Sequence, residues 1–332
     1  MFVAAGIPLL ALAGSHLRCV GRDLAPIASD SSTATTVPAG TLHVPYIAGD
    51  FERVFTPLGT RYLNDHTLVR GPDARWHLYG ITHESTGNPS LERAFLHATA
   101  PTLQGPWNNS LPDALTASPD YDEQVLWAPH VIEARAGIWW MYYYAGQTVA
   151  NDSQVLRRAE SADLSAWSRI VDAPGDRPPG GRDPMVFFDG RNWRLYSVWV
   201  DAQRHGQIVV TTSADLQTWS PMEVALEDPV AEPSLPWGNL ESPFVVAYAG
   251  AFYLFVTRTG ASYADYARTL VFRSNSATRF AWAPITRLQA HAAELVVERD
   301  QWYITSAGWT AYVGESNRGL SIAPLRWATE QP

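Results

Sequence analysis

Three carboxylic acids stand at corresponding places in the sequence. Asp65 and Glu241 each lie 11 residues before an aromatic segment, and Asp183 lies 10 residues before another. A short apolar run follows each acid, which predicts that the three occupy the same part of a repeated structural unit. Neighbouring carboxyl groups raise one another's pKa, so one can stay protonated near neutral pH while another stays ionised. Hydrolysis of a glycosidic bond uses such a pair on either side of the bond.

The elements that must position these acids form an internal repeat. Five aromatic segments begin at Trp76, Trp140, Trp193, Phe252 and Trp302, so successive spacings are 64, 53, 59 and 50 residues. This period is typical of one four-stranded blade per repeat. Turn residues often separate each aromatic segment from the apolar run before it, and this pattern predicts a β-hairpin.

A second tryptophan follows each aromatic segment and keeps the same order. These residues are Trp107, Trp167, Trp219, Trp282 and Trp327. Residues 161–167 and 213–219 are nearly identical, Ser-Ala-Asp-Leu-x-x-Trp. We therefore predict an all-β fold, a five-bladed β-propeller built as a single domain over residues 41–332. Because the first strand of each blade lines the propeller axis, the three acids should meet at one end of the channel.

Composition excludes several classes of function. The chain of 332 residues has a net charge of −9, and its basic residues form no cluster. A nucleic-acid surface or an anionic membrane surface would require a basic patch, so neither is an expected partner. The single cysteine allows no internal disulfide and no cysteine-based zinc site. We expect an oligo- or polysaccharide as the partner, no membrane insertion, and a monomer.

Residues 1–40 differ in character from the rest. The first residues form a mostly apolar run with a small-residue exit, which resembles a signal peptide without its basic start. A Ser/Thr/Ala-rich stretch follows and predicts a flexible linker. The expected location is secreted or periplasmic, with a cytoplasmic protein as the alternative.

Short motifs at the three acids resemble a known group of enzymes. Asn64-Asp65, Arg182-Asp183-Pro184 and Glu241-Ser242-Pro243 are similar to the signature blocks of the β-fructosidase and arabinanase propellers, glycoside hydrolase families 32, 68 and 43. Trp127-Ala128-Pro129-His130 resembles a second-blade motif of family 43. The resemblance runs from about residue 41 to residue 327.

The resemblance implies a role for each acid. Asp65 would be the nucleophile of a retaining enzyme, or the base that activates water in an inverting one. Asp183 would hold sugar hydroxyls and stabilise the transition state, and Glu241 would be the general acid. Two departures from the invertase pattern stand out, His66 after Asp65 and Ser242 after Glu241.

Other residues near these motifs are candidates for binding. Asn64, Trp127, His130, Arg182, Trp237 and Glu294 are the expected substrate-binding residues. His291 takes the corresponding position in the fifth repeat and is the candidate metal ligand. The chemistry requires no cofactor, and a structural Ca²⁺ in the central channel is an additional expectation.

Two classes of function remain after these observations. The first is a glycoside hydrolase of furanosidic bonds, with β-fructofuranosides as the main prediction. Its alternative is an inverting arabinofuranosidase, arabinanase or xylosidase-like hydrolase. A non-catalytic carbohydrate-binding propeller is the second class, and it would be expected to lack at least one of the three acids.

Overall fold

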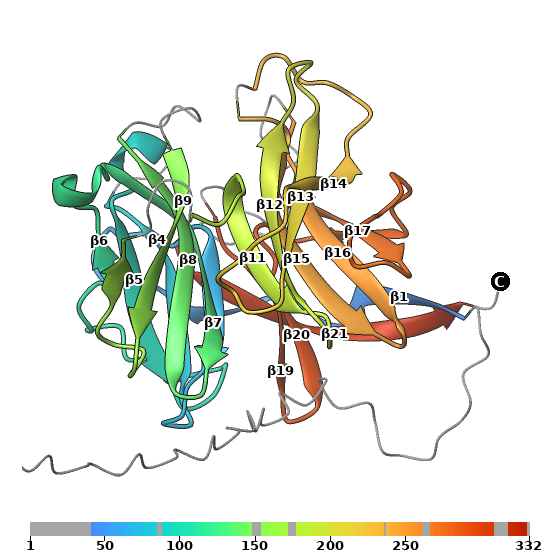
Figure 1. The fold of residues 1–332 in the computed structure, drawn as a ribbon. Coiled ribbons are helices and arrows are strands. Elements are labelled where there is room, and N and C mark those ends of the chain that lie inside the picture. The colour runs from blue at the N-terminus through green and yellow to red at the C-terminus, as the bar shows by residue number, and fades with distance from the viewer. Residues whose placement is uncertain are drawn as a thin grey trace, which may run out of the picture. The chain divides into compact units, whose positions relative to one another are not determined.

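The computed structural model describes residues 41–84, 88–147, 154–171, 177–235, 237–260, 266–308 and 318–330. These residues form a five-bladed β-propeller, as the repeat predicts (Figure 1). The predicted signal-like segment and linker of residues 1–40 lie outside this part of the chain. No helix among the described residues is long and apolar enough to cross a membrane.

Each blade is an antiparallel sheet, and in blades 1 to 4 the strands follow one another outward in chain order. Blade 1 holds β3 (His66–Arg70), β4 (Trp76–Thr82), β5 (Ala94–Ala100) and β6 (Leu115–Thr116). Blade 2 holds β7 (Val125–Arg135), β8 (Ile138–Gly146), β9 (Gln154–Ser161) and β10 (Ser168–Ile170). Blade 3 holds β11 (Arg182–Phe188), β12 (Trp193–Val200), β13 (Gly206–Ser213) and β14 (Glu223–Glu227). Blade 4 holds β15 (Leu240–Tyr248), β16 (Ala251–Arg258), β17 (Arg268–Ser274) and β18 (Thr286–Gln289).

Blade 5 closes the ring with strands from both ends of the described chain. It holds β19 (Leu295–Glu298), β20 (Gln301–Ser306), β21 (Leu320–Glu330) and β1 (Leu42–Ile47). β1 pairs with β21 over six residues, and Figure 1 shows the two strands side by side in blue and red. The short β2 (Glu52–Phe55) also pairs with β21. Two 3₁₀ turns, η1 (Pro89–Leu91) and η2 (Pro119–Tyr121), lie in connections.

The repeated tryptophans explain how the blades adhere. Five hydrophobic clusters fill the spaces between neighbouring blades, and each of them includes the second tryptophan of one repeat. Trp167 of blade 2, for example, packs in the cluster shared with blade 1, where its ring meets Tyr79 edge-on. Burial of large aromatic surface is the main force that joins one sheet to the next.

The two nearly identical heptads form the same turn. In each, an aspartate side chain accepts hydrogen bonds from backbone N–H groups two and three residues later. The leucine that follows this aspartate is in the left-handed region, with φ of 61° at Leu164 and 63° at Leu216. The carbonyl groups of both leucines then accept hydrogen bonds from the preceding blade, from Tyr79 and from Arg158. The heptad is therefore a device for docking blades.

Candidate active site

The inner strands begin with the same backbone irregularity in four blades. The backbone there is in the left-handed region, with φ between 47° and 55°, which residues other than glycine rarely adopt. The four residues are Ala128, Asp183, Ser242 and Ala292. In blades 2, 3 and 4 a shift in strand register occurs at this residue. Such bulges turn a side chain away from its ordinary direction in the sheet and are frequent next to active sites.

This irregularity corrects the predicted correspondence of the acids. Asp183 occupies the left-handed position itself, which Ser242 occupies in blade 4. Glu241 precedes that position, so its counterpart in blade 3 is Arg182 rather than Asp183. The difference of one residue in spacing, 10 instead of 11, has this cause. Spacing alone could not show which residue adopts the unusual conformation.

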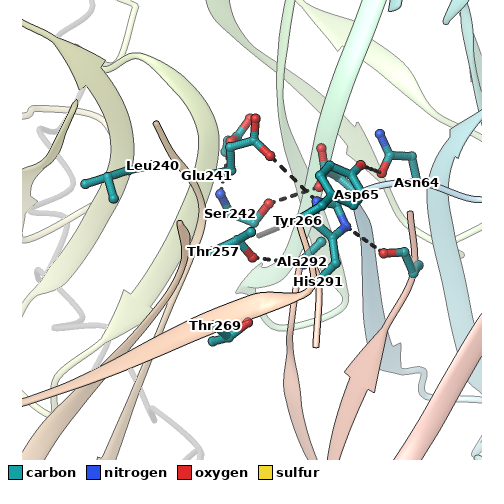
Figure 2. A network of polar contacts seen from close by, with 12 residues as sticks. Asn64, Asp65, Leu240, Glu241, Ser242, Thr257, Tyr266, Thr269, His291 and Ala292 are labelled. Carbon is teal, nitrogen blue, oxygen red and sulfur yellow. Dashed lines mark hydrogen bonds and ion pairs between the residues drawn. The ribbon is translucent and has the colours of Figure 1, made fainter. Parts of the chain in front are cut away.

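Ser242 connects two of the acids, and Figure 2 shows its contact with one of them, Asp65. Its hydroxyl donates to Asp65 Oδ1 at 3.0 Å, and its backbone N–H donates to Asp183 Oδ2 at 3.0 Å. Asp65 stands immediately before β3, and β4 holds it there because the Ile81 N–H donates to the Asp65 carbonyl. Acids from blades 1 and 3 are thus brought together by one residue of blade 4.

Arg182 supplies the positive charge of the site. Its Nη1 lies 2.6 Å from Asp183 Oδ2, and its Nη2 lies 3.8 Å from Glu241 Oε1. The same guanidinium donates to the carbonyl groups of Trp237 and Leu240. Arg182 is buried and uses most of its N–H groups in these contacts, so the structure makes it a clamp on two acids and on the loop before β15.

Glu241 faces His291 of blade 5. The imidazole Nδ1 donates to the Ala307 carbonyl at 2.6 Å, and Nε2 lies 3.6 Å from Glu241 Oε2. Because Nδ1 carries a hydrogen, the Nε2 of a neutral ring can only accept. Without a proton on either group, the Nε2 lone pair would face the carboxylate and repel it. A proton on Nε2 or on Glu241 makes the contact attractive. Figure 2 shows this pair together with Asp65.

Tyr266 covers His291 and reaches Asn64. Its ring stacks on the imidazole with centroids 3.7 Å apart, and its hydroxyl donates to Asn64 Oδ1 at 3.2 Å. Asn64 is buried and its backbone N–H donates to the Ile81 carbonyl. The predicted substrate-binding residue Asn64 therefore contacts Tyr266 and supports the segment that carries Asp65.

Burial and charge separate the pKa values of the three acids. Burial, reinforced by the charges of Asp183 and Glu241, raises the pKa of Asp65 to about 7. Burial also raises the pKa of Asp183, even though the adjacent Arg182 opposes it. At Glu241 burial again favours the protonated form, but the contacts with His291 and Arg182 outweigh it and lower the pKa. Asp65 and Asp183 therefore keep their protons to higher pH than Glu241 does.

A second polar network lies deeper in the channel. Glu294 of blade 5 accepts a hydrogen bond from the Leu68 N–H of blade 1 at 3.0 Å, and its other oxygen lies 3.7 Å from His130 Nδ1 of blade 2. The His130 Nε2 donates to the Val186 carbonyl of blade 3 at 3.0 Å. Both side chains are buried, so they connect the inner strands of four blades. They also line the cavity next to Asp65 and Asp183.

The structural Ca²⁺ in the central channel stays a prediction, with His291 as its candidate ligand. Calcium takes six to eight oxygen ligands. The described part of the chain contains no group of three His, Cys, Asp or Glu side chains that could hold a metal ion. His291, the expected ligand, offers only Nε2, which already faces Glu241. No step of the chemistry is therefore assigned to a metal.

The two predicted tryptophans have different surroundings. Trp127 is half-buried and packs against the hydrophobic cluster between blades 1 and 2. It does not line the cavity next to Asp65. Trp237 lies beside Arg182 and lines a cleft with it. Substrate binding by Trp127, Trp237, His130 and Glu294 stays a prediction.

Sequence reasoning missed Ser242 and Tyr266 as parts of the site. The sequence places Ser242 in the motif Glu241-Ser242-Pro243 and marks it as a departure from the invertase pattern, but it gives this residue no role of its own. Tyr266 stands outside the repeat, just before β17, and no periodicity in the sequence marks it.

Comparisons with known proteins agree with this geometry. Residues 100–331, more than two thirds of the 332, match the sequence model of glycosyl hydrolases family 43. No curated protein matches the chain.

Solved structures with the same fold include the GH43_1 enzyme from Xanthomonas citri, at 15% identity and a TM-score of 0.59, covering 82% of this chain and 89% of that one. An exo-1,5-α-L-arabinanase from a bovine ruminal metagenomic library has 16% identity and a TM-score of 0.58, covering 83% and 100%. A β-xylosidase/α-arabinofuranosidase from a compost microbial metagenome, solved with xylotriose in a calcium-free form, has 15% identity and a TM-score of 0.58, covering 85% and 95%.

Proposed function

The chain belongs to the glycosyl hydrolases of family 43, and we propose that it hydrolyses α-L-arabinofuranosidic or β-D-xylosidic bonds with inversion. The main support within the molecule is the convergence of three acids from three blades, joined through Ser242 and Arg182. The match to family 43 supports this alternative and does not support the prediction of a β-fructofuranosidase. The substrate class follows what the names of the similar structures say of those proteins.

Each acid has a role that suits its surroundings. Glu241 protonates the oxygen of the leaving sugar, with a proton drawn from the pair that it forms with His291. Asp65 takes a proton from the attacking water, because a base is most effective when its pKa lies near the working pH. Asp183, paired with Arg182 and held by Ser242, stays fixed near the reacting centre and stabilises the positive charge that develops on the sugar.

A substrate panel with a matched variant tests this function. The panel holds arabinan, arabino-oligosaccharides, xylotriose and xylan, with sucrose, inulin and levan for the fructoside alternative. We expect cleavage of a pentoside, and a loss of roughly a thousandfold or more in Glu241→Gln, which keeps the shape of the side chain but cannot donate an acidic proton.

Two results would contradict the proposal. Cleavage of fructosides in preference to pentosides would favour a β-fructofuranosidase over the proposed pentosidase. Full activity of Glu241→Gln on substrates with poor leaving groups would remove Glu241 from the role of acid. Unfolding temperatures of the variant and the wild type, measured side by side, serve as the control for folding.

A further inference from the structure

A cleft of about 180 Å³ lies beside Arg182 and separately from the cavity at Asp65. Its walls are mainly apolar and include Tyr144, Val198, Trp199, Val200 and Trp237. The walls come from blade 2, blade 3 and the loop that leads to blade 4.

Trp199 is the unusual residue of this cleft. It is 42% exposed at the end of β12, whereas most tryptophans of the chain pack between blades. An aromatic side chain that lines a concave site and stays accessible is available to pack on a ligand. A flat apolar ring at the wall of a cleft suits the C–H face of a sugar ring.

The position of the cleft relative to the acids defines which part of the substrate it can hold. Arg182 forms part of the cleft wall, and its Nη2 lies 3.8 Å from Glu241, the proposed acid. Asp65, the proposed base, lines the other cavity. The general acid protonates the leaving oxygen, so the leaving sugar must extend from the side of Glu241.

The cleft is also held in shape before any ligand arrives. Arg182 donates to the carbonyl of Trp237 through both Nε and Nη2, at 3.4 and 3.1 Å. The Arg182 guanidinium, which also pairs with Asp183, thus holds the loop that carries Trp237, one aromatic residue of the cleft wall. A preformed wall avoids the entropy cost of ordering a loop on binding.

We infer that this cleft is the subsite for the leaving-group sugar, and that Trp199 stacks on its ring. The inference rests on the proposed function and assigns residues to a substrate position that the three acids alone do not define. It predicts a dependence on Trp199 only for substrates whose leaving group is a sugar.

A pair of substrates tests it in the full-length protein. The first is the disaccharide of the pentose that the substrate panel identifies, and the second is the glycosyl fluoride of that pentose, whose leaving group has no ring. In Trp199→Ala, kcat/KM for the disaccharide should fall roughly tenfold, mostly through KM. For the fluoride it should stay within about twofold of the wild type. Trp199→Phe should recover part of the loss.

Phe188→Ala is the matched control. Phe188 is 41% exposed at the opposite end of β11 in the same blade, and it does not line the cleft. This variant should leave both substrates unaffected. Equal losses on the two substrates in Trp199→Ala, or no loss on the disaccharide, would overturn the subsite while leaving the proposed function intact. A wild type that cleaves neither substrate would overturn the proposed function and the subsite with it.

Discussion

At the scale of single residues, the site separates three chemically similar acids by their neighbours. Asp65 has a serine hydroxyl and two acids close by, and its pKa is raised to about 7. Glu241 has a histidine and an arginine close by, and its pKa is lowered. Because the groups interact, the observed pKa values belong to the set and not to one member. The reactive protonation state of the set carries one proton in total. It prevails at pH values between the lowered pKa and the raised pKa.

The pH dependence of kcat/KM follows from these shifts. The reactive form of the set carries its one proton on Glu241 and leaves Asp65 ionised as the base. The singly protonated set loses its proton as the pH rises through about 7, so activity should fall there. It should persist on the acid side below the ordinary pKa of a glutamate, because the pKa of Glu241 is lowered. A bell-shaped profile measured on a soluble substrate checks both limbs. An alkaline limb above roughly pH 8 would contradict the environment assigned to Asp65.

Ser242→Ala isolates the contact between blades 1 and 4. The hydroxyl of Ser242 lowers the pKa of Asp65, so its removal should raise that pKa and move the alkaline limb upward by about half to one pH unit. kcat should also fall, because Asp65 loses its fixed orientation.

Ser242→Gly is the companion variant. It removes the same hydroxyl, keeps the backbone N–H that Asp183 accepts, and relaxes the left-handed backbone at φ 50°. Equal shifts of the alkaline limb in the two variants would assign the effect to the hydroxyl. An unchanged limb in both would show that Ser242 does not tune Asp65.

At the scale of elements, the start of β11 determines where Arg182 and Asp183 lie. Gly181 precedes them and packs directly on the neighbouring strand, so that a Cβ there would lie 1.8 Å from the Val198 carbonyl oxygen. Backbone atoms cannot move aside as a flexible side chain can. The absence of a side chain at Gly181 therefore allows the close approach of β11 to β12.

Gly181→Ala should therefore be damaging and Gly180→Ala much less so. The first should displace β11, lower the free energy of unfolding by about 2 kcal/mol or more, and reduce kcat. At Gly180 the nearest atom to a new Cβ is a serine hydroxyl at 3.0 Å, which can rotate. Urea unfolding and kinetics of the two variants measure the difference. Equal stability of both would contradict the packing described for β11.

Elements of the repeat were predictable because the blade has a strong signal in the sequence. The second strand of each blade coincides with an aromatic segment of the repeat. β4 begins at Trp76, for example, and β12 begins at Trp193. The repeated tryptophans follow because every blade must bury one against its neighbour. The left-handed residue near the start of the inner strand in four of the blades has no such signal, since alanine, aspartate and serine all occur there. The sequence therefore could not show that Asp183 occupies the left-handed position and that Glu241 stands one residue before it.

At the scale of the whole molecule, the site exists only when the ring is closed. The hydrogen bond between Ser242 and Asp65 joins residues 177 positions apart in the chain. The hydrogen bond between Glu294 and Leu68 joins residues 226 positions apart. Strands β1 and β21 close the same ring at its outer edge. Contacts of this separation depend on the assembled fold, so sequence could suggest that the acids converge but could not reveal which groups join them.

The roles proposed for the acids imply one stereochemical outcome. A water molecule activated by Asp65 attacks from the face opposite to the sugar that leaves beside Glu241, and a single displacement of this kind inverts the anomeric carbon. The most direct measurement is a proton NMR time course of the wild type on its pentoside substrate. The anomer that forms first should be opposite in configuration to the bond cleaved, before mutarotation mixes the two. A first product that retains the configuration would contradict the account and make Asp65 a nucleophile.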